Sequence, residues 1–479
     1  MSLKRQIAYN TIVQLVGKTI STILGLIAVA LLTRSLGVEQ FGWYITASGF
    51  LQFIGIFTDF GFTVTTANLV AEKMFDEHKL INTLFTWRLI TALAANALAV
   101  GIIGFFPYSD TIKLSVIVLS VSFLASSLNQ VFIGFYQASL ATVIFTTGEI
   151  LGRAALIGAI VGVSWLEKGF LPIMVAVSCS SFVYFGYLVA RYGHLRLSFN
   201  RAISRLMFAR LWPTAIAIIC NTMYLQGDRL LLPLYVSQTE VGLYGASYRV
   251  LDIVLQLAAL LMGIMMPLIA GAWARRAAEG ASNVHRLLQT SFDLVALFLL
   301  PAAAAIFVIS RPIMQFVAGA DFAPAGIILQ RLSPAIIGIT LGMTFGHVVL
   351  ALNRQRQALK IYFTVAVCSL AAYVILLPRF GVNGAIIVTL FSEFAAGTWL
   401  MILACRSAKF WPNPFSFLKI FLASTVMAMV LFYCRSLPLF GLLPIGLGVY
   451  SLLVALFKVA RPSTLREIFA AKKLPTNVQ

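Results

Sequence analysis

The sequence contains 479 residues, of which 60% are hydrophobic and only 11% are charged. Its mean hydropathy is +0.94, whereas soluble domains carry roughly 25% charged residues. This composition excludes a water-soluble globular protein. The formal net charge of +19 points either to nucleic acid or to an anionic membrane surface as a partner, so the positions of the charges must decide between the two.

Apolar runs of about twenty residues, long enough to cross a ~30 Å hydrocarbon layer as helices, recur along the chain. The N-terminus, with Lys4 and Arg5 before a long apolar stretch and no small-residue cleavage site, indicates a retained first span rather than a signal peptide. We predict an all-α integral membrane protein of about fourteen transmembrane helices. The spans are expected near residues 10–33, 41–60, 80–106, 113–136, 140–164, 169–191, 210–235, 241–270, 288–310, 329–352, 358–377, 383–404, 416–434 and 439–457.

Most of the 35 Lys and Arg residues fall on one side of the membrane when the N-terminus is placed inside, as the positive-inside rule requires. The densest basic stretches are Arg191 to Arg210 and the tail from Lys458 to Lys473. Basic residues beside membrane ends attract anionic lipid headgroups. We therefore expect anionic lipids as partners, no nucleic acid, and both termini in the cytoplasm.

An internal repeat divides the chain. At an offset of 200 residues, Gly42 and Tyr44 register with Gly242 and Tyr244, each pair lying where an apolar helix ends and the next begins. Six spans precede the basic segment, so the second copy starts on the same side as the first, and the repeats are parallel; transporters of this build bind substrate between their halves. The predicted domains are an N-lobe (1–191), a basic cytoplasmic linker (192–209), a C-lobe (210–404), two additional spans (405–458) and a basic cytoplasmic tail (459–479).

Polar residues inside the spans are functional candidates, because an ionisable group in hydrocarbon is costly unless it is paired or faces water. In the first span Asn10, Gln14 and Lys18 recur at helical spacing and form one polar stripe. Lys18 has no acid within a turn. Arg88 in the third span has no local acid either, although it could snorkel to the cytoplasmic edge.

Other intramembrane charges are open to two interpretations. Arg249 and Asp252 are three residues apart, and Glu149 and Arg153 are four apart, so each pair could neutralise itself along a helix or contact a ligand. Asp228 could lock two helices together or contact cargo. Glu393, in the middle of the twelfth span, could bind a coupling ion or pair with an arginine.

The five cysteines form no paired spacing, which argues against a disulfide framework and a metal site. No Gly-rich phosphate loop followed by Lys-Ser/Thr is present, so the chain is not itself an ATPase. We find no Gly-x-Ser-x-Gly and no paired carboxylates in the outer connection at about 311–328, which holds Arg311 and Asp321. We expect a protein that is not an enzyme.

Four segments resemble the Wzx-type polysaccharide flippases of the multidrug/oligosaccharidyl-lipid/polysaccharide exporter superfamily. They are Asn10 through Gly42, Gly227-Asp228-Arg229 followed by Val241 through Tyr244, Ile313 through Ala325, and Leu377 through Ala385. The likeness covers nearly the whole chain. It implies two six-helix lobes of the MATE type around a cationic cavity that opens alternately to either side.

The resemblance also implies a cargo, a glycan linked to undecaprenyl pyrophosphate, and a role in O-antigen, capsule or exopolysaccharide synthesis in a bacterial inner membrane. A polysaccharide polymerase and a chain-length regulator are implied partners, and we expect a monomer without cofactor, driven by H⁺ or Na⁺ or by the membrane potential. The cargo-contacting residues are then expected to be Lys18, Arg249, Arg153, Arg88, Gln14 and Asn10. The coupling or structural acids are expected to be Asp252, Asp228, Glu149 and Glu393.

Three alternatives remain open. A lipid II flippase or a MATE-type multidrug exporter would keep the fold and change the cargo, and drug extruders would favour acids in the cavity. A membrane glycan polymerase or ligase would need a catalytic loop outside the hydrocarbon. A scaffold without transport would not need polar stripes inside its spans.

Overall fold

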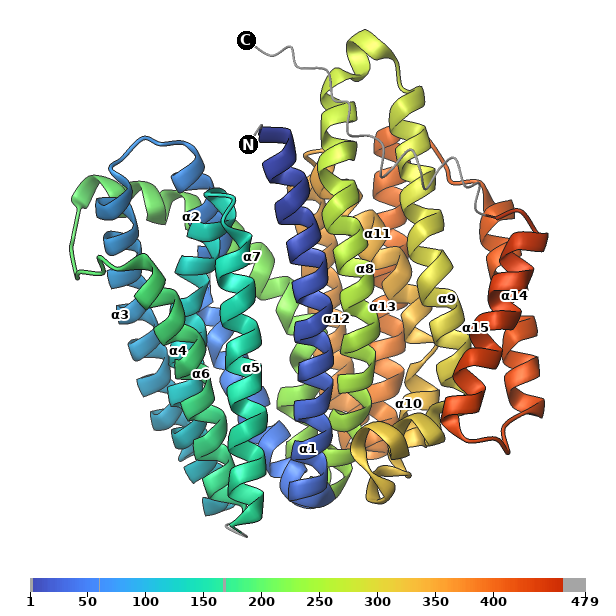
Figure 1. Cartoon of the computed structure of the whole chain (residues 1–479), viewed down its shortest axis with the longest axis horizontal. Coiled ribbons are helices and arrows are strands. Elements are labelled where there is room, and N and C mark those ends of the chain that lie inside the picture. Colours follow the sequence, from blue (N-terminus) through green and yellow to red (C-terminus); the bar gives the residue numbers. More distant parts are fainter. Residues whose placement is uncertain (1–2, 60, 167–168, 460–479) are drawn as a thin grey trace. The chain divides into compact units, whose positions relative to one another are not determined.

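The computed structural model of the chain describes residues 3–59, 61–166 and 169–459. This part consists of helices joined by turns and loops, and it contains no strands. Figure 1 labels the helices. In chain order these are α1 (Leu3–Asp59), α2 (Phe62–Ala71), α3 (Glu77–Ile103), α4 (Asp110–Ala138), α5 (Thr142–Trp165), α6 (Phe170–Tyr192), α7 (Arg201–Leu231), α8 (Gln238–Glu279), α9 (Ser282–Ala318), α10 (Ala325–Leu332), α11 (Ala335–Ala351), α12 (Gln355–Phe380), α13 (Val382–Ala408), α14 (Pro414–Tyr433) and α15 (Leu439–Leu456), with short 3₁₀ turns at Leu232–Leu234 and Ala320–Phe322.

The predicted all-α membrane fold is confirmed. Within the described residues, eleven helices are long and apolar enough to cross a membrane, and the bent pair α10 and α11, which meet at 48°, makes a twelfth. Helix α1 contains two of the predicted spans, and α7 covers the seventh. Every predicted span therefore corresponds to a helical segment.

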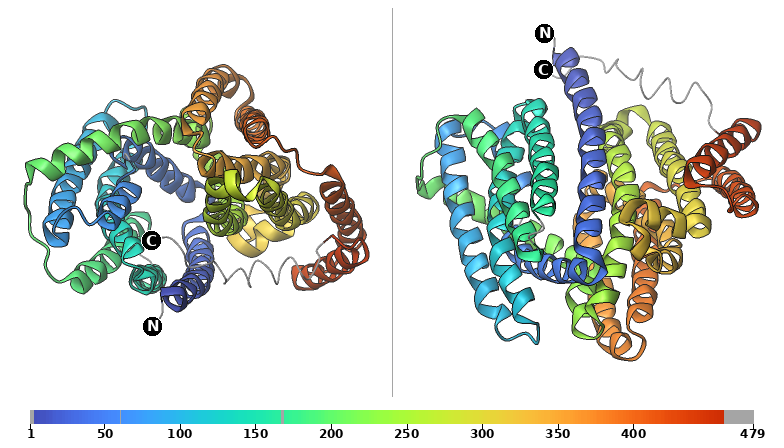
Figure 2. Two further views of the ribbon diagram at one scale, coloured as in Figure 1. Left: turned by 90° about the horizontal axis from the view of Figure 1, so that it is seen from above. Right: turned by 60° about the horizontal axis from the view of Figure 1, so that its bottom comes forward.

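A break at Gly37 separates the two spans inside α1. Gly37 has φ 69° and ψ −179°, a conformation that only glycine adopts without strain. Figure 2 shows that the chain changes direction within α1. The segment α1 therefore consists of two membrane-length helices that are joined at the kink.

The structure differs from the sequence expectations at three connections. The predicted linker 192–209 is partly helical, because Asn200 caps α7 by accepting hydrogen bonds from the backbone N–H groups of Ala202 and Ile203. The short helix α2 lies in what the sequence suggested was a loop. The outer connection predicted at 311–328 is also mostly helical, since α9 continues to Ala318 and α10 begins at Ala325.

Backbone contacts divide the chain into two compact units. The first contains Met1–Ala246, Val317–Asp321 and Ala366–Ala385, and the second contains Ser247–Phe316, Phe322–Val365 and Ile386–Gln479. The predicted division into lobes 1–191 and 210–404 stays a prediction.

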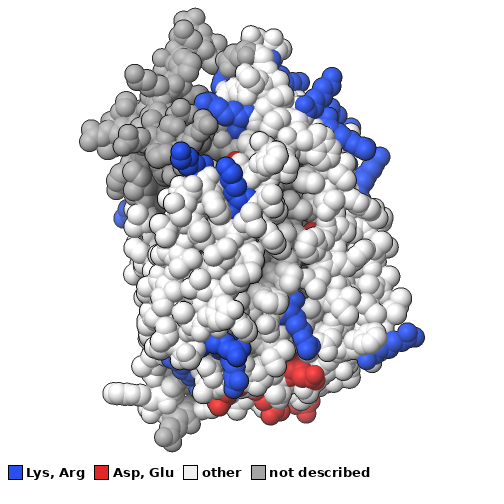
Figure 3. All heavy atoms as spheres, turned by 90° about the vertical axis from the view of Figure 1, so that its right-hand side faces the viewer, with Lys and Arg blue, Asp and Glu red and all other residues white. Residues whose placement is uncertain are grey.

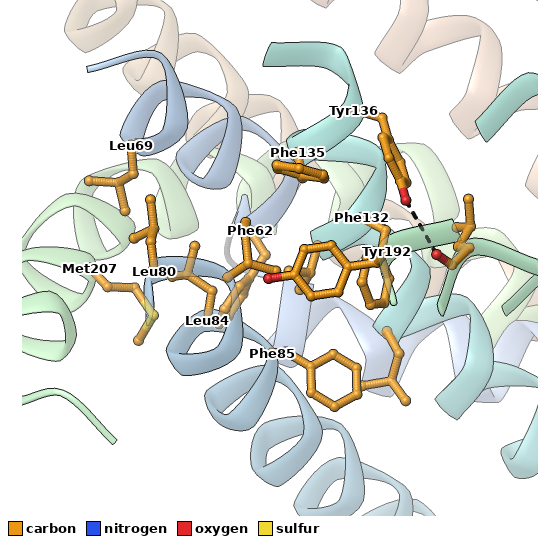
Figure 4. Packing of buried hydrophobic residues seen from close by; sticks show 14 of the residues in the cluster. Phe62, Leu69, Leu80, Leu84, Phe85, Phe132, Phe135, Tyr136, Tyr192 and Met207 are labelled. Atoms are coloured by element: carbon orange, nitrogen blue, oxygen red, sulfur yellow. Dashed lines mark hydrogen bonds between the residues drawn. The ribbon is translucent and has the colours of Figure 1, made fainter. Parts of the chain in front are cut away.

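Aromatic side chains fill the core of the first unit. Figure 4 shows Phe85, Phe132 and Tyr192 packed between neighbouring helices. The Tyr136 hydroxyl donates to the Leu188 carbonyl at 3.3 Å, which satisfies a polar group inside this core. Rigid packing here fixes α3, α4 and α6 relative to one another.

The repeat-equivalent glycines of the first unit pack against each other. A Cβ added to Gly42 would overlap the Gln238 carbonyl and lie 3.2 Å from the backbone nitrogen of Gly242. A Cβ added to Gly242 would overlap the Val38 carbonyl and lie 3.1 Å from the backbone nitrogen of Gly42. The contact is reciprocal, as expected when two copies of one motif meet about a pseudo-twofold axis.

In the second unit, α14 and α15 pack on α9. The Tyr450 hydroxyl donates to the Leu297 carbonyl at 2.7 Å, and Met427 and Leu442 are buried in the same cluster. The opposite face of this helix pair is apolar and exposed, with Phe440 at 73% and Leu447 at 70% exposure. Figure 3 shows charged side chains towards two ends of this face and few between them, as expected for a surface that faces lipid.

Candidate functional site

Helices α1 and α5 meet along a stripe of small residues, in parallel register. Gly17 of α1 faces Thr146 of α5, whose methyl group occupies the space that a Cβ would take. Ser21, one turn further along α1, is fully buried and donates from Oγ to Glu149 of α5 at 2.6 Å. Small residues let helix backbones approach closely in a membrane.

A cluster of three ionisable side chains lies on this contact. The Oε1 atom of Glu149 is 3.3 Å from the Lys18 Nζ and 3.1 Å from the Arg153 Nη2. Two positive charges against one negative charge leave the cluster with a net charge of +1 when all three groups are ionised. The side chains are 34% exposed for Lys18, 32% for Arg153 and 21% for Glu149, so the cluster is reachable from outside the helix pair.

A glycine makes room for the guanidinium. An added Cβ on Gly25 would lie 3.0 Å from the Cζ of Arg153 and overlap its Nη1. Gly25 lies seven residues, about two helical turns, after Lys18 on α1, and the side chain of Arg153 packs against it. Arg153 is thereby held across the surface of α1.

The structure shows which groups of this cluster are in contact, and the role of Lys18, Glu149 and Arg153 in binding cargo stays a prediction. Glu149 does pair with Arg153 along α5, and it also binds Lys18, whose acid partner the sequence did not reveal because it lies on another helix. Gln14 is half-buried on α1. The side chain of Asn10 lies outside the described part of the chain.

Arg88 occupies the core of the first unit rather than an open cavity. Its side chain is among the fully buried ones, with the residue 1% exposed. Its Nε donates to the Ser127 carbonyl at 3.0 Å and its Nη2 to the Gln130 Oε1 at 2.6 Å, while the Cζ lies 4.9 Å from the centre of the Phe62 ring. Arg88 therefore ties α2, α3 and α4 together in this structure.

The remaining candidates lie on other helices. Asp228 of α7 is 1% exposed, and its Oδ2 accepts a hydrogen bond from the Tyr244 hydroxyl of α8 at 2.6 Å, a link between two helices. Arg249 and Asp252 are half-buried on α8, in the second unit. Glu393 of α13 is 7% exposed, beside Gly338 of α11, whose added Cβ would lie 2.8 Å from the Glu393 carbonyl carbon.

A further ion pair among the described residues joins Arg210, in the first half of α7, to Glu72 at the end of α2. Arg210 Nη1 donates to Glu72 Oε1 at 2.6 Å between α7 and the end of α2. This hydrogen bond, together with the charge of Arg210, lowers the pKa of the Glu72 carboxyl from its usual value. The pair is exposed. Because it also joins an arginine to a glutamate, its variants are matched controls for variants of the α1–α5 cluster.

The second unit contains an apolar cavity of about 300 Å³ between α9, α11 and α14. Leu300 and Phe307 line it from α9, Pro334 and Ile337 from the break before α11, and Phe421 from α14. Sequence reasoning did not find it, since its walls come from three distant segments of ordinary apolar composition. Its chemistry suits a hydrocarbon chain rather than a polar group.

These features define a multi-pass integral membrane protein with a net cationic cluster between two helices of its first unit. Residues 31–326 match the family model described as "Polysaccharide biosynthesis protein". The chain belongs to this family, which is a family of transporters and not of enzymes.

Relatives of known fold and name agree with this membership. The chain is 22% identical over 475 residues to the "Probable low-salt glycan biosynthesis flippase Agl15" of Haloferax volcanii, covering 92% of this chain and 94% of the relative. It is similar in fold to the lipid II flippase MurJ in an inward closed conformation, with a TM-score of 0.77, 16% identity and coverage of 93% and 98%. An inward-facing MATE family multidrug transporter of the MOP superfamily gives a TM-score of 0.65, 14% identity and coverage of 83% and 98%.

Proposed function

We propose that this protein translocates oligosaccharide repeat units linked to undecaprenyl pyrophosphate across the bacterial inner membrane, for the synthesis of a surface polysaccharide such as O-antigen, capsule or exopolysaccharide. Membership in the polysaccharide biosynthesis family and the likeness to a glycan flippase support a lipid-linked glycan as cargo. The observation that carries the proposal is the cluster of Lys18 and Arg153 around one carboxylate.

The physical problem of the reaction is the charge of the headgroup. A pyrophosphate diester carries about two negative charges, and moving an ion into hydrocarbon costs several kcal/mol unless it meets a partner. Arginine contacts phosphate oxygens through two parallel N–H groups, and lysine supplies a point charge. Lys18 and Arg153, each about one-third exposed, are suited to accompany such a headgroup.

The hydrocarbon tail presents the opposite problem, because it is best left in an apolar environment. The cavity between α9, α11 and α14 is lined by Leu300, Phe307 and Phe421. We assign it to part of the polyprenyl chain, which would be held there by van der Waals packing against these apolar side chains.

We further propose alternating access between the two lobes, driven by an H⁺ or Na⁺ gradient or by the membrane potential, with both termini in the cytoplasm. Asp252, Asp228, Glu149 and Glu393, each within a membrane-length helix, are the acids that we propose for coupling or for a structural role. Anionic lipids, a polysaccharide polymerase and a chain-length regulator are the proposed partners of a monomeric transporter.

A lipid II flippase is the second candidate. The observation that favours it is the similarity of fold to MurJ over 93% of this chain. A multidrug exporter is less well supported, because the α1–α5 cluster has two cations for one acid, whereas a site for cationic drugs would favour acids.

The test is deletion of the gene followed by analysis of undecaprenyl-linked glycans. We expect the repeat unit of one surface polysaccharide to accumulate on the cytoplasmic face, and expression of the wild-type chain to restore export. Accumulation of lipid II would favour the second candidate. Normal export of every glycan in the deletion strain would refute both.

A further inference from the structure

The donors around Glu149 converge on a single oxygen. Lys18 Nζ lies 3.3 Å, Arg153 Nη2 3.1 Å and Ser21 Oγ 2.6 Å from the same atom, Oε1. A carboxylate has two oxygens that together accept about four hydrogen bonds. Three donors from two helices directed at one point form the arrangement that a single phosphate oxygen would also accept.

The cluster is poorly matched to a carboxylate in charge. Two cations face one monoanion, so one positive charge is uncompensated within the cluster. A phosphate or pyrophosphate group brings more negative charge and more acceptor oxygens than Glu149 can offer. In the absence of such a group, Glu149 lowers the cost of holding two cations inside a membrane-length segment.

From this geometry we propose that Glu149 is a displaceable internal ligand, which occupies an anion site formed by Lys18, Arg153 and Ser21 and yields these donors to the phosphate groups of an incoming substrate. The inference rests on the proposed function and adds a competing group to its binding site. The exposure of Glu149, 21% for the side chain, means that the carboxylate already borders accessible space.

The alternative is that Glu149 is a fixed support that holds the two cations in position. The two roles predict opposite effects of removing the carboxylate. A competitor, once removed, leaves two free cations and tightens the binding of an anion. If the carboxylate is a support, its removal leaves the side chains of Lys18 and Arg153 less well positioned and weakens that binding.

Gly25 and Ser21 bear on this choice. Gly25 leaves space in which the Arg153 guanidinium lies against α1, and Ser21 is fully buried in the helix contact. Arg153 and Ser21 are therefore positioned by packing as well as by Glu149. This packing favours the displaceable ligand, because the donors keep a framework when the carboxylate leaves.

The experiment measures the binding of inorganic pyrophosphate to the purified full-length protein by isothermal titration calorimetry. We expect Glu149→Gln to bind pyrophosphate at least about tenfold more tightly than the wild type. Lys18→Ala and Arg153→Ala should each bind it at least about tenfold more weakly. Glu72→Gln, which removes the carboxylate of the exposed pair with Arg210, is the matched control and should leave the affinity unchanged.

Unchanged or weaker binding by Glu149→Gln would overturn the inference, as would the absence of pyrophosphate binding by both wild type and variant. Glu149→Ala is the second variant if Glu149→Gln does not fold. If neither variant folds, the carboxylate is a structural requirement and the inference is wrong. The proposed function fails separately, if the wild-type protein does not translocate a lipid-linked glycan whatever its affinity for pyrophosphate.

Discussion

Lys18 in α1 and Glu149 in α5 are 131 residues apart in the sequence, yet their Nζ and Oε1 atoms lie 3.3 Å apart in the folded protein. The same oxygen accepts a hydrogen bond from Arg153. A lysine that had no acidic neighbour in the sequence thus belongs to a cluster of defined charge. The polar stripe of α1 is therefore one half of a site whose other half lies on α5.

Removing either cation of the cluster should impair export. We expect Lys18→Ala and Arg153→Ala each to lower the amount of surface polysaccharide at least about tenfold, because a charge-assisted hydrogen bond is worth about 1.5–3 kcal/mol. Arg153→Lys should recover little of the activity, since lysine lacks the planar fork of arginine. Quantification of the polysaccharide at equal protein abundance checks this.

The matched control for these variants is Arg210→Ala, which breaks an exposed ion pair of the same type with Glu72. Export should stay near the wild-type level in this variant, because exposed pairs contribute only about 0–1 kcal/mol to stability. If Arg210→Ala reduced export as strongly as Lys18→Ala, a general loss of charge would explain both results.

Gly25→Leu should displace the Arg153 guanidinium without removing any charge. The new side chain would occupy the space in which Nη1 now lies, so export should fall towards the level of Arg153→Ala. Gly158→Leu on α5 is the control, because nothing lies within 4 Å of a Cβ built there. Wild-type export by Gly25→Leu at normal abundance would show that the position of Arg153 is unimportant.

Arg88→Met should destabilise the protein more than it changes transport. The substitution removes the two hydrogen bonds that the Arg88 guanidinium donates to the Ser127 carbonyl and to the Gln130 side chain, and a hydrogen bond from a charged group is worth about 1.5–3 kcal/mol. Thermal unfolding of the purified protein should show a lower midpoint, with transport per folded molecule close to normal. A stable Arg88→Met protein without transport would instead place Arg88 in contact with cargo.

Gly42→Ala and Gly242→Ala should both be severely destabilising. Each added methyl group would overlap a backbone carbonyl of the other repeat motif, and backbone cannot move aside as a side chain can. We expect greatly reduced yields of folded protein by size-exclusion chromatography for both variants, with Gly158→Ala as the tolerated control. A normal yield for either variant would contradict the close contact of the two motifs.

The sequence predicted the helices well because hydropathy and length are local properties. Every predicted span coincides with a helical segment, and the offset that aligned Gly42 with Gly242 identified two residues that touch. The short helix α2 was missed because ten residues are too few for a span, and the helical start of α7 was missed because it carries Arg201, Arg205 and Arg210.

The candidate site was predicted only in part. Spacing along one helix revealed the pair Glu149 and Arg153, but no pattern along the chain indicates which helix lies beside Lys18. The burial of Arg88 could not be predicted either. The side chain is fully buried because residues of neighbouring helices surround it. Contacts between helices depend on packing, and single-helix periodicity does not encode the partner.

The measurement that tests the central claim most directly is translocation of an undecaprenyl-pyrophosphate-linked oligosaccharide in vesicles reconstituted with the purified protein. The wild type should move the glycan between leaflets faster than protein-free vesicles do, and the double variant Lys18→Ala/Arg153→Ala should lose most of this activity while Arg210→Ala retains it. Transport by the double variant at the wild-type rate, or no transport by the wild type in the presence of an ion gradient and a membrane potential, would contradict the assignment.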